Sequence, residues 1–180
     1  MIHPDTQLRW IDDHIGFGVF ATAPIPVGTV LVAPDPLDQR ISRKDFEQLP
    51  SIVADRAWHF MYHDEQGQLV LSWDHARYLN HACQANSLLT QWGFEIVVRP
   101  ILTGDEVTTD YGALRLTQPV EMGCQCTPCR VVIGPDDPQM MGELWGEMIA
   151  EALLRAPHLP QPLEACFSPR QRAILNLNAQ

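Results

Sequence analysis

Three cysteines close together in the second half of the chain are the residues whose spacing most directly suggests chemistry. Cys124-x-Cys126-x-x-Cys129 places three thiols within six positions. A structural zinc site is usually tetrahedral and takes four nitrogen or sulfur ligands, so one ligand must come from another part of the chain. Cys83 is the natural fourth ligand, and His81 is an alternative. The cluster therefore predicts a structural zinc site that joins the middle of the chain to its C-terminal part.

Three further motifs contain residues that could take part in a reaction, but none of them specifies one alone. Gly16-Phe17-Gly18 permits a tight backbone that a ligand can approach closely. In isolation it is better explained as a hairpin turn, and it lacks the third glycine and following helix of a dinucleotide-binding fingerprint. Asn80-His81 could form a turn with an Asx hydrogen bond. Tyr111 could be a buried aromatic residue whose hydroxyl finds a carbonyl.

Composition limits the classes of protein that this chain could belong to. Its 180 residues are 46% apolar and 19% charged, which is typical of one folded domain with its own core. Acidic residues outnumber basic ones, 22 against 12, and the net charge of −10 disfavours nucleic acid as a partner. A cationic peptide or protein suits this field better, although acidity that only aids solubility is more common.

The sequence also favours a reducing compartment. No apolar run approaches the roughly 20 residues that a membrane helix needs, and the N-terminus has no signal-peptide pattern. Five cysteines, three of them clustered, are more typical of reduced metal ligands than of a disulfide framework. The fifth, Cys166, lies in a proline-rich segment with no neighbouring ligand. We therefore expect a cytoplasmic protein, or a nuclear one if the source is eukaryotic.

Most of the chain has the pattern of a mainly β protein. Short apolar runs alternate with turn residues about every ten positions, which disfavours repeated βαβ units. Ser42, with an acidic residue three positions later, predicts a short helix that ends before Pro50. The expected strands are 8–11, 19–21, 29–32, 58–63, 69–72, 88–92 and 94–99.

The last part of the chain is expected to be helical. Asp137-Pro138 predicts a cap and a proline at the first helical position, and Pro157 marks the end of the helix. Ser168-Pro169 predicts a second, short helix. Both helices should pack on the β body or on a second copy of the chain. The apolar residues at helical spacing are Met141, Leu144, Trp145, Met148 and Ala152.

Taken together, four motifs in order resemble the SET domain of protein-lysine methyltransferases with its post-SET zinc segment. Residues 16–21 are similar to the pattern Gly-Trp-Gly-Val-x-Ala, and residues 77–86 to Arg-Phe-x-Asn-His-Ser-Cys-x-Pro-Asn. Residues 104–112 look like Gly-Glu-Glu-Leu-Thr-Phe-Asp-Tyr-Gly, and residues 124–130 match the post-SET pattern. The resemblance extends from about Leu8 to Arg130, which is most of the chain.

This resemblance implies a fold and a domain organisation. The family fold is mainly β, a β-clip-like body of several short sheets with a pseudoknot, and a helical tail follows here. The implied boundaries are 6–117 for the SET domain, 118–132 for the post-SET zinc-binding segment and 133–180 for the C-terminal helical extension.

The resemblance also implies an activity and a site. The activity is transfer of a methyl group from S-adenosylmethionine to the ε-amine of a substrate lysine, which enters through a narrow channel from the opposite face. Tyr111 would be the catalytic residue and would orient the methyl group and the amine. The implied cofactor-binding residues are Gly16, Phe17, Gly18, Asn80, His81 and Tyr111, with the glycine segment acting mainly through its backbone. The implied zinc ligands are Cys83, Cys124, Cys126 and Cys129.

Several positions depart from the family pattern. Phe17 replaces a tryptophan, and Ala82 and Ala85 replace a serine and a proline. Thr109 stands where the family usually has Phe or Tyr, a position linked to the number of methyl groups added. Because the small side chain of threonine leaves room for an amine that already carries methyl groups, we expect higher methylation states. The alternative function is a weak or inactive SET-like module that binds a partner through its acidic surface and helical tail.

The expected partner of the enzyme is a basic protein or peptide that contains the substrate lysine. We expect no membrane or direct nucleic-acid binding, and a homodimer could form through the C-terminal helices. Lys44 is the only lysine in the chain, on the short helix after Ser42, so it is the only internal target for self-methylation.

Overall fold

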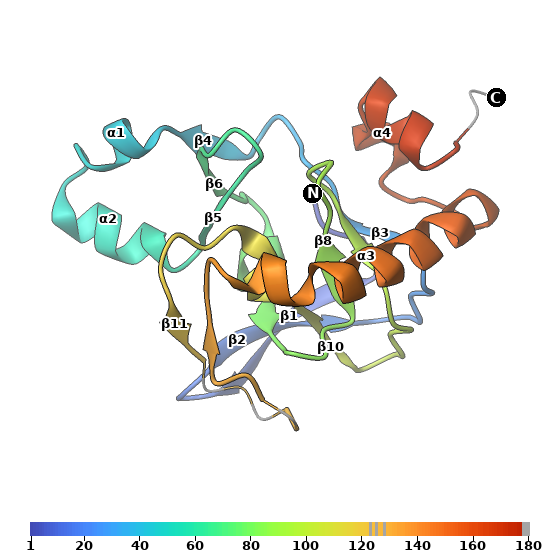
Figure 1. Cartoon of the computed structure of the whole chain (residues 1–180), viewed down its shortest axis with the longest axis horizontal. Coiled ribbons are helices and arrows are strands. Elements are labelled where there is room, and N and C mark those ends of the chain that lie inside the picture. Colours follow the sequence, from blue (N-terminus) through green and yellow to red (C-terminus); the bar gives the residue numbers. More distant parts are fainter. Residues whose placement is uncertain (123, 125, 128, 178–180) are drawn as a thin grey trace.

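The structure is a computed structural model that describes residues 1–122, 124, 126, 127 and 129–177. Its main sheet has seven strands among the described residues, in the order β1-β2-β10-β8-β9-β3, and β7 pairs with β10 beside this path (Figure 1). The strands of this sheet are β1 (Thr6–Asp12), β2 (Gly16–Ala21), β3 (Val30–Val32), β7 (Asn80–His81), β8 (Ser87–Leu89), β9 (Glu95–Val97) and β10 (Glu106–Thr109).

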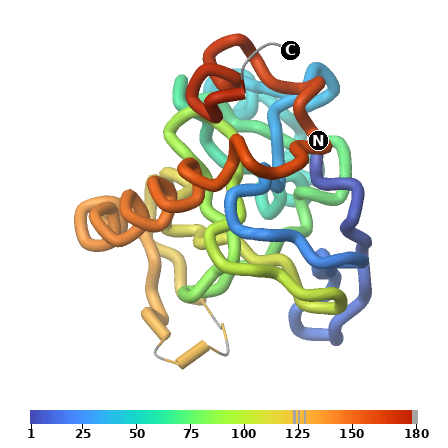
Figure 2. Tube along the Cα trace, turned by 90° about the vertical axis from the view of Figure 1, so that its right-hand side faces the viewer, coloured from blue at the N-terminus to red at the C-terminus, as the bar shows by residue number. Residues whose placement is uncertain are grey.

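In the part of the chain that the structure describes, two smaller sheets and four α-helices complete the fold. One small sheet has the order β4-β6-β5 and lies with α1 and α2 on the left in Figure 1. The pair β11 and β12 belongs to a segment that projects from the body in Figures 1 and 2. The remaining strands are β4 (Gln39–Ile41), β5 (Met61–His63), β6 (Leu69–Leu71), β11 (Val120–Glu121) and β12 (Val132–Ile133). The helices are α1 (Arg43–Phe46), α2 (Ser51–Trp58), α3 (Asp137–Arg155) and α4 (Pro169–Ile174), with short 3-10 turns at His75–Tyr78, Tyr111–Leu114, Ala156–His158 and Glu164–Cys166.

Strand β10 is the element that brings the distant motifs together. It pairs antiparallel with β2 through Glu106 and Val107, and parallel with β7 through Thr108 and Thr109. It also pairs parallel with β8. Parallel neighbours cannot be joined by a tight turn, so these pairings are made between segments far apart in the chain. The segment 104–112 consequently lies between the glycine segment of β2 and Asn80-His81.

The expected β character of the chain is confirmed, but helix α2 was not predicted from the sequence. The predicted hairpins around residues 64–68 and Gly93 are present as β5–β6 and β8–β9, with shorter strands than expected. Ser42 caps α1 by accepting a hydrogen bond from the backbone N–H of Asp45, as predicted. Residues 58–60 were wrongly assigned to a strand, because α2 begins after Pro50 and runs through Trp58.

The C-terminal helices pack on the main sheet. Ala152, Leu163 and Leu175 belong to the same buried cluster as Val30 and Ile96 of the sheet. The helix and the turn before β3 approach closely: a Cβ on Gly28 would lie 2.8 Å from the carbonyl oxygen of Ala152. The tail is therefore part of the domain's own core, and the homodimer stays a prediction. Within the described residues, none of the helices has the length and apolar character needed to cross a bilayer.

The start of α3 differs from the expected cap. Asp136 stands at the N-cap without a side-chain hydrogen bond, and Asp137 is the first helical residue. The Asp137 carboxylate is 1% exposed and accepts hydrogen bonds from the backbone N–H of Gly134 and from Arg130 instead. The second helix begins as predicted, because Ser168 and Gln171 form a reciprocal capping box at α4.

Candidate active site and metal centre

Asn80 and His81 are neighbours on β7 whose side chains serve two different parts of the site. Successive side chains of a strand point to opposite faces. The Asn80 amide donates hydrogen bonds to the carbonyl oxygen of Phe17, at 3.1 Å, and to the Glu106 carboxylate, at 2.8 Å. The His81 ring instead lies between Cys83 and Tyr111. One dipeptide thus holds the glycine segment on one side and the tyrosine and cysteines on the other.

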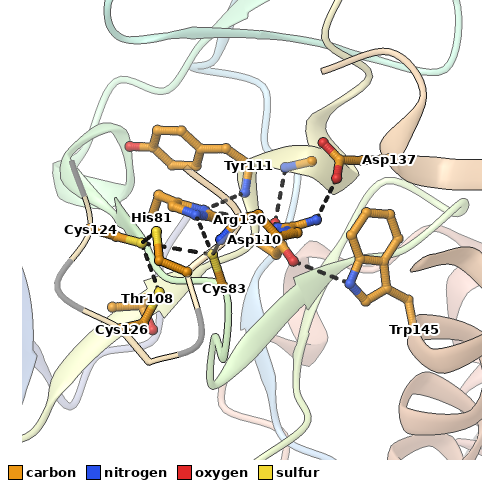
Figure 3. A network of polar contacts seen from close by, with 12 residues as sticks. His81, Cys83, Thr108, Asp110, Tyr111, Cys124, Cys126, Arg130, Asp137 and Trp145 are labelled. Carbon is orange, nitrogen blue, oxygen red and sulfur yellow. Dashed lines mark hydrogen bonds and ion pairs between the residues drawn. The ribbon is translucent and has the colours of Figure 1, made fainter. Parts of the chain in front are cut away.

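His81 acts as a spacer between the cysteine cluster and Tyr111 (Figure 3). Its side chain is 1% exposed. Nδ1 accepts a hydrogen bond from the backbone N–H of Tyr111 at 3.2 Å, and Nε2 lies 3.5 Å from the Cys83 sulfur. Because Nδ1 is an acceptor, the ring proton lies on Nε2 and can be donated to that sulfur. Both ring nitrogens of His81 therefore lie next to groups of the chain itself, and its role in cofactor binding stays a prediction.

Tyr111 lines a cavity of about 400 Å³. Its hydroxyl donates a 2.7 Å hydrogen bond to the carbonyl oxygen of Leu79, the residue before Asn80. Burial, together with the nearby charges of Glu95 and Glu106, raises the pKa of Tyr111 to about 12. The phenol therefore keeps its proton at neutral pH and serves as a hydrogen-bond donor, not as a base.

Apolar side chains make up much of the cavity wall, together with several polar and charged residues. Thr109 also lines it, is 2% exposed, and its hydroxyl has no hydrogen-bond partner among the described residues. Gly16, Phe17, Gly18 and Asn80 are not among its lining residues. Other residues that line it are Phe60, Met61, Ala76, Leu79, Leu89 and Met122.

The four predicted zinc ligands come together. The sulfurs of Cys83, Cys124, Cys126 and Cys129 all lie within 4.8 Å of one another. Cys83 comes from the segment after β7, whereas the other three follow β11, so the cluster joins the middle of the chain to the projecting segment. Cys166 lies elsewhere, packed against the core under α3 and α4.

Comparison with known proteins places the chain in a family. The family model described as SET domain matches residues 16–112, more than half of the chain. The chain belongs to the SET domain family. This SET domain is 28% identical over 142 residues to histone-lysine N-methyltransferase Set2 of Drosophila melanogaster. That alignment covers 71% of this chain and 6% of Set2, so the chain spans a small fraction of the relative's length.

A solved structure gives a weaker likeness. A crystal structure from Plasmodium falciparum, described as that of a histone methyltransferase, shares 17% identity and a TM-score of 0.44 with this SET domain. The match covers 61% of this chain and 95% of that one.

The thiol cluster of this SET domain fits a zinc ion. With Zn–S bonds of about 2.3 Å, tetrahedral geometry sets the sulfurs about 3.8 Å apart. The sulfurs of Cys83 and Cys124 are 3.7 Å apart. The sulfurs of Cys126 and Cys129 lie 2.7 and 3.0 Å from that of Cys124. Binding of an ion would therefore increase each of these two distances by about 1 Å. Four thiols without a carboxylate or an open position favour a structural site, not a catalytic one.

Arg130 also stabilises the thiolate character of the cluster. Burial alone would raise the pKa of Cys83, but hydrogen bonds outweigh it, chiefly that from the backbone N–H of Arg130 at 3.3 Å, and hold the pKa below its usual value. A thiolate is the form that binds metal. The ligands would be Cys83, Cys124, Cys126 and Cys129, and the ion would fix the projecting segment against β7.

The glycine segment of this SET domain contains an exposed aromatic ring that would suit the adenine of a bound cofactor. A Cβ on Gly18 would lie 2.6 Å from the Ile11 side chain and 2.7 Å from the Glu106 carboxylate, so a larger residue would displace the ends of these two side chains. The Phe17 ring is 41% exposed and meets Tyr78 edge-on, with ring centroids 5.7 Å apart. An exposed aromatic face beside a tightly held backbone suits a flat heterocycle such as adenine.

A buried polar network behind the site was not predicted from the sequence (Figure 3). Asp110, 1% exposed, accepts hydrogen bonds from the Arg130 guanidinium and from the Trp145 indole N–H, the latter at 3.2 Å. Arg130 also donates to Asp137 at 2.6 Å. The network connects the residue before Tyr111, the residue after the last clustered cysteine and helix α3. The signal available in the sequence was Trp145, whose buried indole N–H needs an acceptor.

Proposed function

We propose that this SET domain is an S-adenosylmethionine-dependent protein-lysine N-methyltransferase. The observation that carries the proposal is the position of Tyr111, whose hydroxyl borders a cavity while bonded to the carbonyl next to Asn80. The name of its relative Set2 supports the same chemistry, and points to histones and similar basic, lysine-rich proteins as the first substrates to test. The net charge of −10 is compatible with a cationic partner.

The proposal assigns the cofactor and the substrate lysine to different residues of the site. The Asn80 amide holds the glycine segment through the Phe17 carbonyl, and Gly16, Phe17 and Gly18 would hold the cofactor mainly through their backbone. The cavity that Tyr111 lines does not include them, so a lysine side chain would reach the same point from the other side. When bound, S-adenosylmethionine would supply an electrophilic methyl group on a sulfonium.

The residues of the chain would contribute alignment and desolvation. Near neutral pH only about one free lysine in a thousand is uncharged, so the site must favour loss of the ammonium proton. An apolar channel disfavours the charged form. The Tyr111 hydroxyl, held by the Leu79 carbonyl, would fix the direction from which the amine approaches. Correct alignment of this kind supplies a large part of enzymatic rate enhancement.

The test is transfer of an isotope-labelled methyl group to a lysine-rich protein such as a histone mixture. Lys44→Arg is the preferred background, because it leaves the enzyme without any lysine and so removes self-methylation. Transfer that disappears in Tyr111→Phe supports the proposal. Calorimetric binding of S-adenosylmethionine without transfer to any lysine-containing protein would instead favour a binding module, and no cofactor binding would reject the enzyme.

A further inference from the structure

Glu95 is a buried acidic residue in the wall of the cavity that Tyr111 lines. It lies on β9, where it pairs with Leu89 of β8 and Val32 of β3, and both of these residues line the same cavity. The residue is 7% exposed. A carboxyl group at such a position is unusual, because burying a charge is costly unless it is paired. A buried acid in a cavity wall is therefore a candidate for a functional role.

The carboxylate of Glu95 lacks a cationic partner among the described residues. Ser87 donates a hydrogen bond from its hydroxyl to Oε2 at 2.9 Å. The Thr109 hydroxyl lies near enough to lower the pKa of Glu95, yet it makes no hydrogen bond of normal geometry. The ion pairs found in the described parts of the chain do not include Glu95. A carboxylate in the cavity wall that makes no ion pair with a described residue is available to a cation from outside.

Burial raises the pKa of Glu95 to about 7, and the Ser87 hydrogen bond offsets only part of that effect. The group therefore changes charge near neutral pH, as proton acceptors in active sites often do. Its charge in turn raises the pKa of both Tyr62 and Tyr111, after the larger effect of burial. The titratable and charged groups along the cavity are Tyr62, Tyr111, His59, His63, Arg43 and Arg77.

We propose that Glu95 recognises the ammonium group of the substrate lysine in this cavity and accepts the proton that the ammonium group loses. The inference rests on the proposed function. An N–H bond of the ammonium breaks and an O–H bond forms on the carboxylate, which leaves a neutral amine with a free electron pair and a neutral carboxylic acid. The amine can then attack the methyl donor, and Glu95 releases its proton to water when the product leaves. Charge and protons balance over these steps.

A purely structural role for Glu95 makes a different prediction. If the acid served only to hold Ser87 and β8 in place, an uncharged isostere with the same hydrogen-bonding capacity would leave cation binding unchanged. Glu95→Gln keeps the shape and can still accept the Ser87 hydrogen bond. The effect of Glu95→Gln on cation binding therefore distinguishes a role in recognition from a purely structural role.

The test uses n-butylammonium as a probe, because it has the four-carbon chain and the charge of a lysine side chain. The uncharged control ligand of the same length is n-butanol. Binding is followed at pH 8 by NMR through the backbone amides of Thr109 and Tyr111. The wild type should bind n-butylammonium about tenfold or more tightly than n-butanol, as expected of a charge-assisted hydrogen bond. Glu95→Gln should lose this preference. Glu143→Gln, the same change at an exposed position on α3, should keep it.

Several outcomes would overturn the proposal. These are failure of the wild type to prefer n-butylammonium, an unchanged preference in Glu95→Gln, or equal weakening of both probes. If Glu95→Gln does not fold, Ser87→Ala gives a second test. Loss of that hydroxyl donor should raise the pKa of the Glu95 carboxyl and move the onset of n-butylammonium binding to higher pH. Binding that does not follow the titration of Glu95 contradicts the proposal.

The probe experiment also keeps this inference separate from the proposed function. It requires no cofactor and no methyl transfer. A wild type that prefers the cation but never transfers a methyl group would reject the enzyme and leave cation recognition standing. A wild type that transfers methyl groups, with an unchanged cation preference in Glu95→Gln, would reject only the role of Glu95.

Discussion

The hydroxyl of Tyr111 donates a 2.7 Å hydrogen bond to the carbonyl oxygen of Leu79. The two residues are 32 positions apart, and each belongs to a motif that the sequence singled out. The bond is made possible by the parallel pairing of β10 with β7, which brings Thr109 level with His81. It fixes the phenol at the wall of the cavity, next to the segment that contains Asn80.

Removal of this hydroxyl should damage transfer more than folding. Tyr111→Phe leaves the Leu79 carbonyl without its donor and costs about 1–3 kcal/mol of stability. We expect the rate of methyl transfer to fall about a hundredfold, because the amine loses its fixed direction. The measurement is kcat/KM for labelled methyl transfer, with thermal unfolding in parallel.

Tyr78→Phe is the matched control for that variant. Its ring contacts Phe17 and Phe60 edge-on, and these contacts do not need the hydroxyl. Transfer should remain near the wild-type rate. Equal loss of activity in the two variants would contradict a specific role for the Tyr111 hydroxyl.

Zinc content is expected to depend on the four clustered thiols alone. The purified protein should contain one zinc per chain, and Cys126→Ser should lower both the zinc content and the melting temperature. Structural zinc contributes on the order of 10 kcal/mol in small zinc-dependent domains. Cys166→Ser removes a cysteine outside the cluster and should keep the full metal content. Metal analysis that finds no zinc in the wild type would refute this site.

The ion pairs of Arg130 should contribute far more to the free energy of unfolding than an exposed ion pair does. Arg130→Ala removes the arginine cation that pairs with the buried carboxylates of Asp110 and Asp137, which should cost about 3–5 kcal/mol of unfolding free energy. Arg155→Ala removes an exposed pair with Glu151 on α3 and should cost about 0.2–1 kcal/mol. Denaturant unfolding of both variants measures the difference, and similar values would show that the network is not stabilising.

The motifs of the candidate site could be predicted from the sequence, but the contacts between the segments that contain them could not. Asn80, His81, Tyr111 and the clustered cysteines have types and spacings that point to their chemistry, and local signals such as Ser168 marked helix starts correctly. The network around Asp110 depends on side chains from separate segments, so no local pattern encodes it. Helix α2 was missed because Pro50 was interpreted as the end of a helix, although the next helix begins directly after it.

Glu95 should make stability depend on pH in a predictable direction. Its pKa is about 7 in the folded protein and near 4.5 in the unfolded chain. The folded state therefore binds more protons between these values, so the stabilisation from the neutral acid is complete below pH 4.5 and is lost as pH rises to about 7. Between pH 5 and 7 the free energy of unfolding of Glu95→Gln should rise relative to the wild type by roughly 2–3 kcal/mol.

Denaturant unfolding of the two proteins across this range measures that difference. Other ionisable groups cancel in the comparison because both proteins contain them. A difference that stays constant from pH 5 to 7 would mean that Glu95 titrates outside this range.

Thr109 is expected to set how many methyl groups are added. It lines the cavity, and its small side chain leaves room for an amine that already has a methyl group. The wild type should produce di- or trimethyllysine, and Thr109→Tyr should shift the product toward monomethyllysine. Thr109→Ser keeps the side chain small and should retain the wild-type product. Strict monomethylation by the wild type, unchanged in Thr109→Tyr, would contradict this role.

The most direct test of the account is to locate the transferred methyl group. The Lys44→Arg protein is incubated with S-adenosylmethionine and a histone mixture, and the products are mapped by tandem mass spectrometry. We predict methyl groups on the ε-amine of lysine, at sites that stay unmodified when Tyr111→Phe is introduced. No modified lysine with a zinc-loaded, folded protein, or the same sites modified by Tyr111→Phe at the same rate, would contradict the account.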